Sequence, residues 1–122
     1  MTFDWSAYYV LAEYLADPGS SVPDREAALR SAISRAYFAA YRTLRNHLYE
    51  TKNYRPSRDR EDHREVRDWL MNHRCGGIAE DLRRLASRRG MADYDNEIGN
   101  LEKETQAALM LAQDILEKTP RI

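Results

Sequence analysis

The chain has 122 residues, of which 43% are hydrophobic and 32% charged, with five glycines, four prolines and one cysteine. This length and composition predict a single domain over residues 1–122 and favour an ordered, charge-coated helical protein over a disordered or β-rich one. The formal net charge of −1 argues against a general polyanion binder.

Charge is unevenly distributed along the sequence. Residues 52–89 carry 11 Lys and Arg against 7 Asp and Glu, whereas residues 90–122 carry 3 against 7. This asymmetry predicts either a local anion-binding site or two segments that neutralise each other in the fold, and we favour the second interpretation.

A first helix is predicted over about residues 5–16, where Asp4 can act as its amino-terminal cap. Its expected inward stripe is Trp5, Tyr8, Ala12 and Leu15. The stretch DPGSSVPD follows, and its two prolines and one glycine break the chain.

The second predicted helix begins after its cap, Asp24, and continues to about Tyr49. Apolar residues repeat at steps of three and four around so much of its circumference that it should be the buried central helix. These residues are Leu29, Ile33, Ala36, Tyr37, Ala40, Leu44 and Leu48. Arg35 and Arg42 lie seven residues apart, and therefore on one face, where they stay available for charge interactions.

The third helix is predicted over about residues 58–73. Pro56 disfavours helix in the residue before it, and Ser57 is a suitable cap. Gly76 and Gly77 are expected to end this helix. Its polar positions alternate in sign, which is typical of a solvated face with weak ion pairs.

The last two helices are predicted over about residues 78–89 and 97–118. Gly90 is a natural stop for the first of them, and the arginines at its carboxyl end suit the helix dipole. After the loop GMADYDN, Asp95 or Asn96 can cap the final helix. The sequence therefore predicts an all-α fold, an up-and-down antiparallel bundle of four or five helices.

Three stretches resemble a known family: SAISRAYFAAYRTLRNHL in the second helix, HREVRDWL from His63 to Leu70, and LRRLASRRGMADYD from Leu82 to Asp95. In this order and at these separations they resemble HEPN-domain proteins of bacteria and archaea. They are most similar to a subgroup with a SRAYYA-like second helix and an RN-x-ADYD string at the end of the fourth. The resemblance runs from about Tyr14 to Leu116. It implies a HEPN-like helical bundle, often a homodimer, of the kind found in toxin–antitoxin, antiviral and RNA-processing systems.

The resemblance also implies a type of chemistry. Many HEPN proteins are metal-independent endoribonucleases that use an arginine followed, after four to six residues, by a histidine. Such cleavage needs groups that move a proton from the 2′-hydroxyl and to the leaving oxygen, and a cation for the phosphorane charge. The register places the arginine at Arg89, but Tyr94 stands where active relatives carry histidine. Tyrosine titrates near pH 10 and is a poor general base at neutral pH, which weakens the ribonuclease interpretation, although Tyr94 could orient a phosphate or act as an acid.

The catalytic candidates are therefore Arg89, Tyr94 and His63, the last because it matches a subgroup histidine that opens the string HxxV. Other arginine–spacer–histidine pairs occur at about the frequency expected by chance in an arginine-rich chain. They end at His47 and His73, and His47 is better explained as a hydrogen-bonded core or interface residue.

The binding candidates are Arg35, Arg88, Asp93 and Asp95. In one interpretation, Asp93 and Asp95 cap the final helix and pair with Arg88 or Arg89 as a structural clasp. In the other, Asp93 joins Arg35, Arg89 and Tyr94 in a polar pocket over the second helix. The two interpretations are compatible, and we favour the clasp.

These observations predict a HEPN-like RNA- or nucleotide-binding protein of a prokaryotic toxin–antitoxin, defence or stress system, with a degenerate endoribonuclease motif. The alternative is a non-catalytic interaction module that uses Tyr9, Tyr41 or the last helix to bind a nucleotidyltransferase, an antitoxin or another protein. A purely structural role is the third possibility.

No cofactor is expected, and no metal, because His73 and Cys75 are too few ligands. The single cysteine cannot form an internal disulfide, no signal sequence opens the chain and no apolar run could cross a membrane. A cytoplasmic protein without membrane association is therefore expected.

Overall fold

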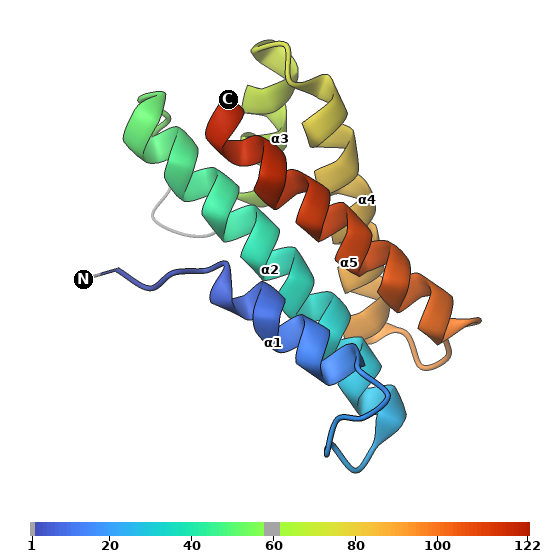
Figure 1. Cartoon of the computed structure of the whole chain (residues 1–122). Helices are drawn as coiled ribbons and strands as arrows, with labels where there is room; N and C mark the ends of the chain where they lie inside the picture. Colours follow the sequence, from blue (N-terminus) through green and yellow to red (C-terminus); the bar gives the residue numbers. More distant parts are fainter. Residues whose placement is uncertain (1, 58–61) are drawn as a thin grey trace.

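The computed structural model describes residues 2–57 and 62–122. These residues form five α-helices and a closing 3-10 turn, without a strand (Figure 1). The elements are α1 (Ala7–Ala16), α2 (Arg25–Thr51), α3 (His63–Asn72), α4 (Gly76–Tyr94), α5 (Leu101–Lys118) and η1 (Thr119–Arg121). In Figure 1, α1, α2, α4 and α5 alternate in direction, so the predicted all-α, up-and-down bundle is confirmed.

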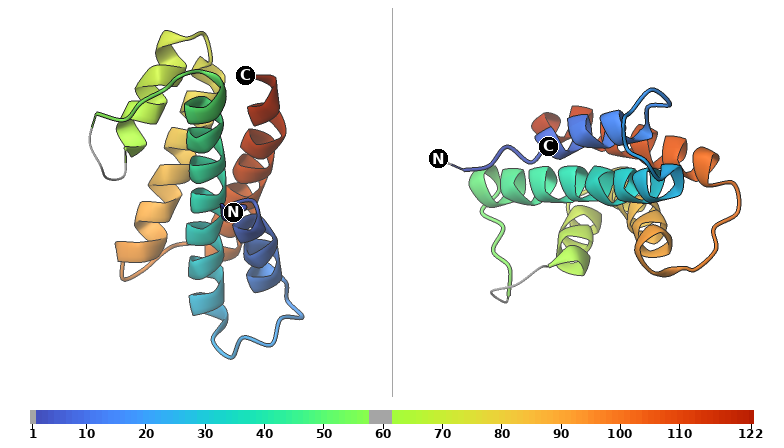
Figure 2. Two further views of the ribbon diagram at one scale, coloured as in Figure 1. Left: turned by 90° about the vertical axis from the view of Figure 1, so that its left-hand side faces the viewer. Right: turned by 90° about the horizontal axis from the view of Figure 1, so that it is seen from below.

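The central helix is α2, as the apolar pattern predicts. It packs against α1, α4 and α5, and the two views of Figure 2 show α1 and α5 on one side of it and α3 and α4 on the other. The Asp24 side chain caps it by accepting a hydrogen bond from the backbone N–H of Ala27 at 3.0 Å. Several of its fully buried residues are small, which lets the neighbouring helices approach closely. They are Ala32, Ala36, Ala39 and Ala40.

Two helix boundaries at glycines differ from the predictions. Gly76 does not end the third helix but begins α4. The turn between α3 and α4 comes two residues earlier, at Arg74, whose φ of 63° lies in the left-handed region. Gly90 does not end the fourth helix, which continues to Tyr94. Burial of Ala92 outweighs the stop signal at Gly90, because the extra turn adds an apolar contact to the core.

The other boundaries shift by a few residues. The first helix begins at Ala7, and Asp4 caps the preceding turn by accepting from the backbone N–H of Ser6 at 3.0 Å. The last helix begins at Leu101, so neither Asp95 nor Asn96 caps it, and Asn100 takes that place with a φ of 54°. The predicted start of the third helix at residue 58 lies outside the described residues.

A buried carboxylate, Asp62, joins α3 to α2. Its side chain is almost completely buried and accepts hydrogen bonds from the Tyr41 hydroxyl at 2.5 Å and from Arg45 Nε at 2.8 Å. The Tyr54 hydroxyl donates to its other oxygen. Burial alone would raise the pKa of Asp62, but these three donors outweigh it and lower the pKa. One charged group is thus satisfied by α2 and by the segment that follows α2.

No helix in the described part of the chain is long and apolar enough to span a membrane.

The Asp62 network predicts a pH-dependent loss of stability. We expect Asp62→Ala to lower the free energy of unfolding by about 3 kcal/mol at pH 7, because it leaves Arg45 and two phenols without their acceptor. Since the fold lowers the pKa of Asp62, this stabilisation is complete above its ordinary value of 3.8 and is lost as the pH falls through the lowered value. The difference between wild type and variant should therefore shrink at about pH 3.

Urea unfolding at the two pH values measures this difference. Asp68→Ala is the matched control, because Asp68 lies exposed on α3. An Asp62→Ala cost as small as that of the control at pH 7 would contradict the structural role of the buried carboxylate.

Candidate functional site

Candidate residues from three helices meet around the half-buried ring of Phe38 on α2. The Cζ atoms of Arg35 and Arg89 lie 5.7 Å and 5.1 Å from the centroid of this ring. The His63 ring centroid lies 6.1 Å from it. We call Arg35, Phe38, His63 and Arg89 the Phe38 cluster. Two guanidinium groups and an imidazole gathered in this way can bind a phosphate.

His63 is held in this cluster by aromatic side chains of α2. As the first residue of α3 it directly follows the buried Asp62. Its ring stacks on that of Tyr41 with 4.2 Å between centroids, and its Nδ1 shares a hydrogen bond with the Tyr37 hydroxyl. The orientation of the imidazole is therefore set by the same tyrosine pair that lines the core of α2.

Arg89 and Asp93 form the predicted clasp. Arg89 Nε lies 2.9 Å from Asp93 Oδ2, one helical turn along α4, and both side chains are about one-quarter exposed. This is an ion pair by distance, although Nε makes no hydrogen bond. The Ser34 hydroxyl donates to the same Asp93 oxygen at 3.4 Å, a weak contact. The extra turn after Gly90 makes this pairing possible, because it keeps Asp93 helical.

Arg88 and Asp95 do not take part in the clasp. Arg88 Nε lies 3.1 Å from Glu104 Oε2 and so links α4 to α5. Asp95 contributes its backbone carbonyl, which accepts from Arg30 Nη1 at 2.6 Å. The predicted pairing of Asp95 with Arg88 or Arg89 is therefore wrong, because Arg88 points to another face of α4 and the chain turns away at Asp95.

Arg30 has a role that the sequence did not indicate. Besides the Asp95 carbonyl, its guanidinium donates to the carbonyls of Ala92 and Asn96, both at 3.2 Å, and so covers the carboxyl end of α4. No sequence pattern reveals such contacts, because they join residues more than 60 positions apart.

The predicted polar pocket over α2 exists in altered form. A surface pocket of about 620 Å³ is lined by Arg35 and Asp93, together with Arg30 and Ser34. Arg89 and Tyr94 do not line it. Tyr94 is 76% exposed, and its ring centroid lies 6.0 Å from Arg89 Cζ, at the outer edge of the Phe38 cluster.

Arg35 and Arg42 remain available for charge interactions, as their spacing predicts. Within the described residues neither forms an ion pair. Each stacks instead on a ring from the amino-terminal segment: Arg35 on Tyr8 at 4.8 Å and Arg42 on Trp5 at 4.6 Å. Tyr8 and Trp5 are therefore half-buried partners of arginines and not core residues, because Ala12 and Ala16 fill the interior face of α1.

The opposite charges of the middle and tail segments neutralise each other in part. Arg88 with Glu104 and Arg89 with Asp93 are ion pairs between the two segments. This agrees with the favoured interpretation, in which the two segments neutralise each other. Arg35 and Arg42 precede the middle segment and do not bear on its predicted anion-binding site.

The remaining histidines lie apart from the Phe38 cluster. His47 is half-buried, with its Nε2 3.3 Å from the carbonyl oxygen of Ile122, which agrees with the predicted structural role. His73 stacks on Trp69 with 3.8 Å between ring centroids. Among the described residues, no three His, Cys, Asp or Glu side chains are grouped closely enough to hold a metal ion.

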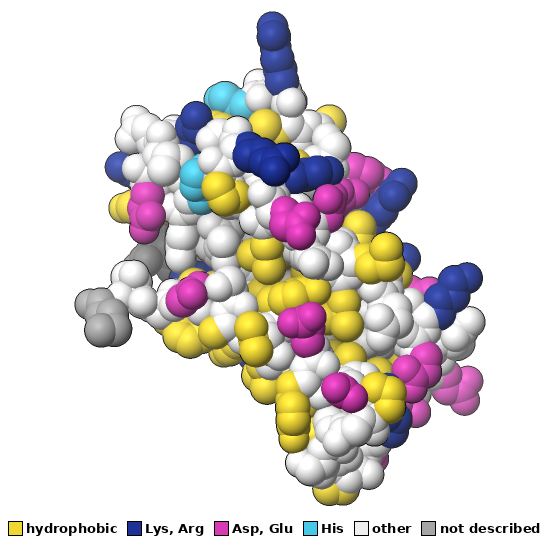
Figure 3. Space-filling view, viewed as in Figure 1, with side chains coloured by type: hydrophobic (Ala, Val, Ile, Leu, Met, Phe, Trp, Pro, Cys, Tyr) yellow, Lys and Arg dark blue, Asp and Glu magenta, His cyan; other side chains and the backbone are white. Residues whose placement is uncertain are grey.

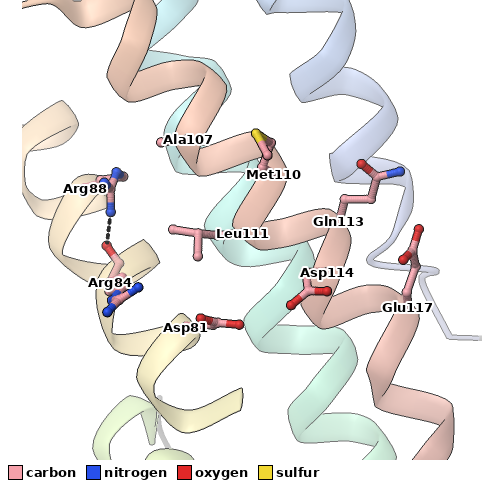
Figure 4. A pocket seen from close by; sticks show the side chains of 9 residues that line it. All are labelled: Asp81, Arg84, Arg88, Ala107, Met110, Leu111, Gln113, Asp114 and Glu117. Carbon is pink, nitrogen blue, oxygen red and sulfur yellow. Dashed lines mark hydrogen bonds between the residues drawn. The ribbon is translucent and has the colours of Figure 1, made fainter. Parts of the chain in front are cut away.

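A second surface pocket, of about 560 Å³, lies between α4 and α5 (Figure 4). Figure 4 shows the carboxyl groups of Asp81 and Asp114 pointing toward each other. Burial raises the pKa of Asp81, and the neighbouring Asp114 raises it further. Asp114 stays ionised beside Lys118, whose Nζ lies 2.8 Å from it.

No known protein family, no curated protein and no solved structure matches this chain. The HEPN resemblance therefore stays a prediction that rests on the three sequence stretches.

The Asp81–Asp114 contact predicts opposite effects of two similar substitutions. Because the fold raises the pKa of Asp81, its contribution is favourable below the ordinary value of 3.8 and is lost as the pH rises through the raised value. Asp81→Asn should therefore raise the free energy of unfolding at pH 7, by up to about 0.5 kcal/mol, and change it little at about pH 3. Asp114→Asn should lower stability at pH 7, since it removes the partner of Lys118. Urea unfolding of both variants checks this, and a shared sign at pH 7 would contradict it.

Proposed function

We propose that the chain is a HEPN-like RNA-binding protein of a prokaryotic conflict or stress system, acting in the cytoplasm, with the Phe38 cluster as its RNA-binding site. One observation carries this proposal. The three stretches that resemble the HEPN family each supply a residue, Arg35, His63 and Arg89, and these residues meet around one aromatic ring. Mutual geometry of candidate side chains from separate segments is one of the criteria by which a functional site is recognised.

The chemistry of the cluster suits RNA. A guanidinium offers several N–H donors in a plane and is a preferred partner of the RNA phosphate. Arg35 carries the uncompensated charge, because Arg89 is already paired with Asp93. The phosphate would therefore first meet Arg35 and then compete with Asp93 for Arg89.

Metal-independent cleavage is the enzymatic form of the proposal. His63 would move the proton between the 2′-hydroxyl, which attacks phosphorus, and the 5′-oxygen, which leaves. Arg89 would stabilise the charge on the phosphorane. Tyr94, exposed beside Arg89, would orient the phosphate. The family resemblance implies a homodimer, in which a second copy of the chain would complete this surface.

A second candidate function, a non-catalytic interaction module, is supported by exposed apolar side chains. Val10 on α1 and Met110 on α5 are 65% and 70% exposed. In Figure 3, hydrophobic side chains gather over α1 and α5, with acidic ones among them. This surface could bind a nucleotidyltransferase, an antitoxin or another protein. Tyr41 cannot contribute to it, because its ring is fully buried against α3.

The RNA-binding proposal predicts that Arg35→Ala and Arg89→Ala each weaken binding of an unpaired, fluorescently labelled RNA of about 10 nucleotides. Each lost phosphate contact should also lower the slope of log affinity against log salt by about 0.7. Fluorescence anisotropy over a salt series measures both. Arg83→Ala is the matched control, because Arg83 lies exposed on α4 and pairs only locally with Glu80.

The same protein preparations test cleavage. In the presence of a chelator, RNA should be cut by wild type and left intact by Arg89→Ala and His63→Ala. Intact RNA with every protein would remove the enzymatic form and leave RNA binding standing. Unchanged affinity in both arginine variants would contradict the proposal. Loss of a copurifying partner in Val10→Glu, with RNA binding absent, would favour the interaction module.

A further inference from the structure

We infer that bound RNA continues from the Phe38 cluster along α2 into a second site, which takes an unpaired base and its phosphate. This inference rests on the proposed RNA binding and extends it to unpaired RNA. The second site, here called the Trp5 cleft, has a volume of about 580 Å³. It lies between the segment that precedes α1 and the second half of α2. The residues of its lining that matter here are Phe3, Trp5, Arg42, Asn46, Tyr49 and Glu50.

Aromatic side chains form the walls of the Trp5 cleft. The Trp5 ring packs edge-on against Phe3 and Tyr8, with 4.9 Å and 5.3 Å between centroids. Phe3 remains 53% exposed, and Tyr49 is also exposed. Exposed rings around a cleft are unusual for side chains of this size, because burying them would stabilise the fold. Arg55 already covers one face of Tyr49, with its Cζ 4.1 Å from the ring centroid. The exposed faces that remain, above all that of Phe3, can stack on a base of any identity.

Arg42 supplies the cation of the cleft. Its guanidinium lies over the Trp5 ring, and its buried Nε has no hydrogen-bond partner. Arg42 forms no ion pair with a described residue, so a phosphate in the cleft would not have to displace a carboxylate from its guanidinium. Arg45, which also lines the cleft, is already bound to Asp62. Glu50 adds a negative charge to the lining, so the cleft suits a base with one phosphate and disfavours a run of phosphates.

A continuous series of ring contacts connects the Trp5 cleft to the Phe38 cluster. The Arg42 guanidinium stacks on the Trp5 ring, which contacts the Tyr8 ring. The Arg35 guanidinium stacks on the Tyr8 ring and also lies over the Phe38 ring. The distances between ring centroids, or between a Cζ atom and a centroid, are 4.6–5.7 Å. Arg35, Phe38 and Arg42 lie at steps of three and four residues and therefore share one face of α2.

The length of this line sets the size of the ligand. Arg35 and Arg42 are two helical turns apart, about 10 Å along the axis. A stacked strand rises about 3.4 Å per nucleotide, so about three nucleotides span the two arginines. A duplex would keep its base faces stacked inside the helix and could not use the rings. Unpaired RNA is therefore the ligand that fits the surface.

The experiment uses the full chain with Trp69→Phe, in which Trp5 is the only remaining tryptophan. An unpaired RNA of about 10 nucleotides should quench Trp5 fluorescence, and a hairpin duplex should not. Arg42→Ala and Trp5→Leu should weaken binding of the unpaired RNA at least about fivefold. Trp5→Phe, which keeps an aromatic face, should weaken binding of the unpaired RNA less than Trp5→Leu does. Arg83→Ala is the matched control for Arg42→Ala, and circular dichroism checks that each variant is folded.

The outcomes separate this inference from the proposed function. If Arg35→Ala and Arg89→Ala weaken binding but Trp5→Leu and Arg42→Ala do not, the second site is overturned and RNA binding at the Phe38 cluster stands. If duplex and unpaired RNA bind equally and both quench Trp5, base stacking in the cleft is overturned. If wild type binds no RNA at all, the proposed function and the inference fall together.

Discussion

The buried carboxylate of Asp62 fixes how α3 meets the rest of the bundle. A short helix of ten residues with few buried side chains is weakly held by apolar contacts alone. Asp62 compensates with hydrogen bonds from Tyr41, Arg45 and Tyr54, each of which would be costly to leave unsatisfied. His63, the next residue, is thereby placed on the tyrosine rings of α2. The position of the His63 imidazole thus depends on the hydrogen bonds of the neighbouring Asp62.

The two faces of α2 divide structure from proposed function. Its inward face carries alanines, aliphatic residues and two tyrosines that are buried. Its other face carries arginines that stack on Tyr8 of α1 and on Trp5, which precedes α1. The 3.6-residue period of the helix separates the buried residues from the arginines. The helix that organises the core therefore also sets the spacing of the cations along the surface.

The periodic features of the sequence were sufficient to predict the bundle and the central helix. The pairing of Arg89 with Asp93 was one of several expected because the two aspartates follow closely after the arginines. Features that depend on distant segments were not predictable. Gly90 is a stop signal locally, but burial of Ala92 and the hydrogen bonds that Arg30 of α2 donates to the end of α4 favour another helical turn. Likewise, the donors to Asp62 come partly from a non-periodic loop, and adjacent arginines on a helix point about 100° apart, so Arg88 and Arg89 have different partners.

The stacked arginines also bear on the entropy of binding. A free arginine side chain loses up to about 2 kcal/mol of rotamer freedom when it is immobilised by a ligand. Arg35 and Arg42 have lost part of that freedom already, because the rings of Tyr8 and Trp5 hold their guanidinium groups in place. The surface along α2 is thus preorganised, and a ligand that fits it would gain affinity without first ordering the side chains that contact it.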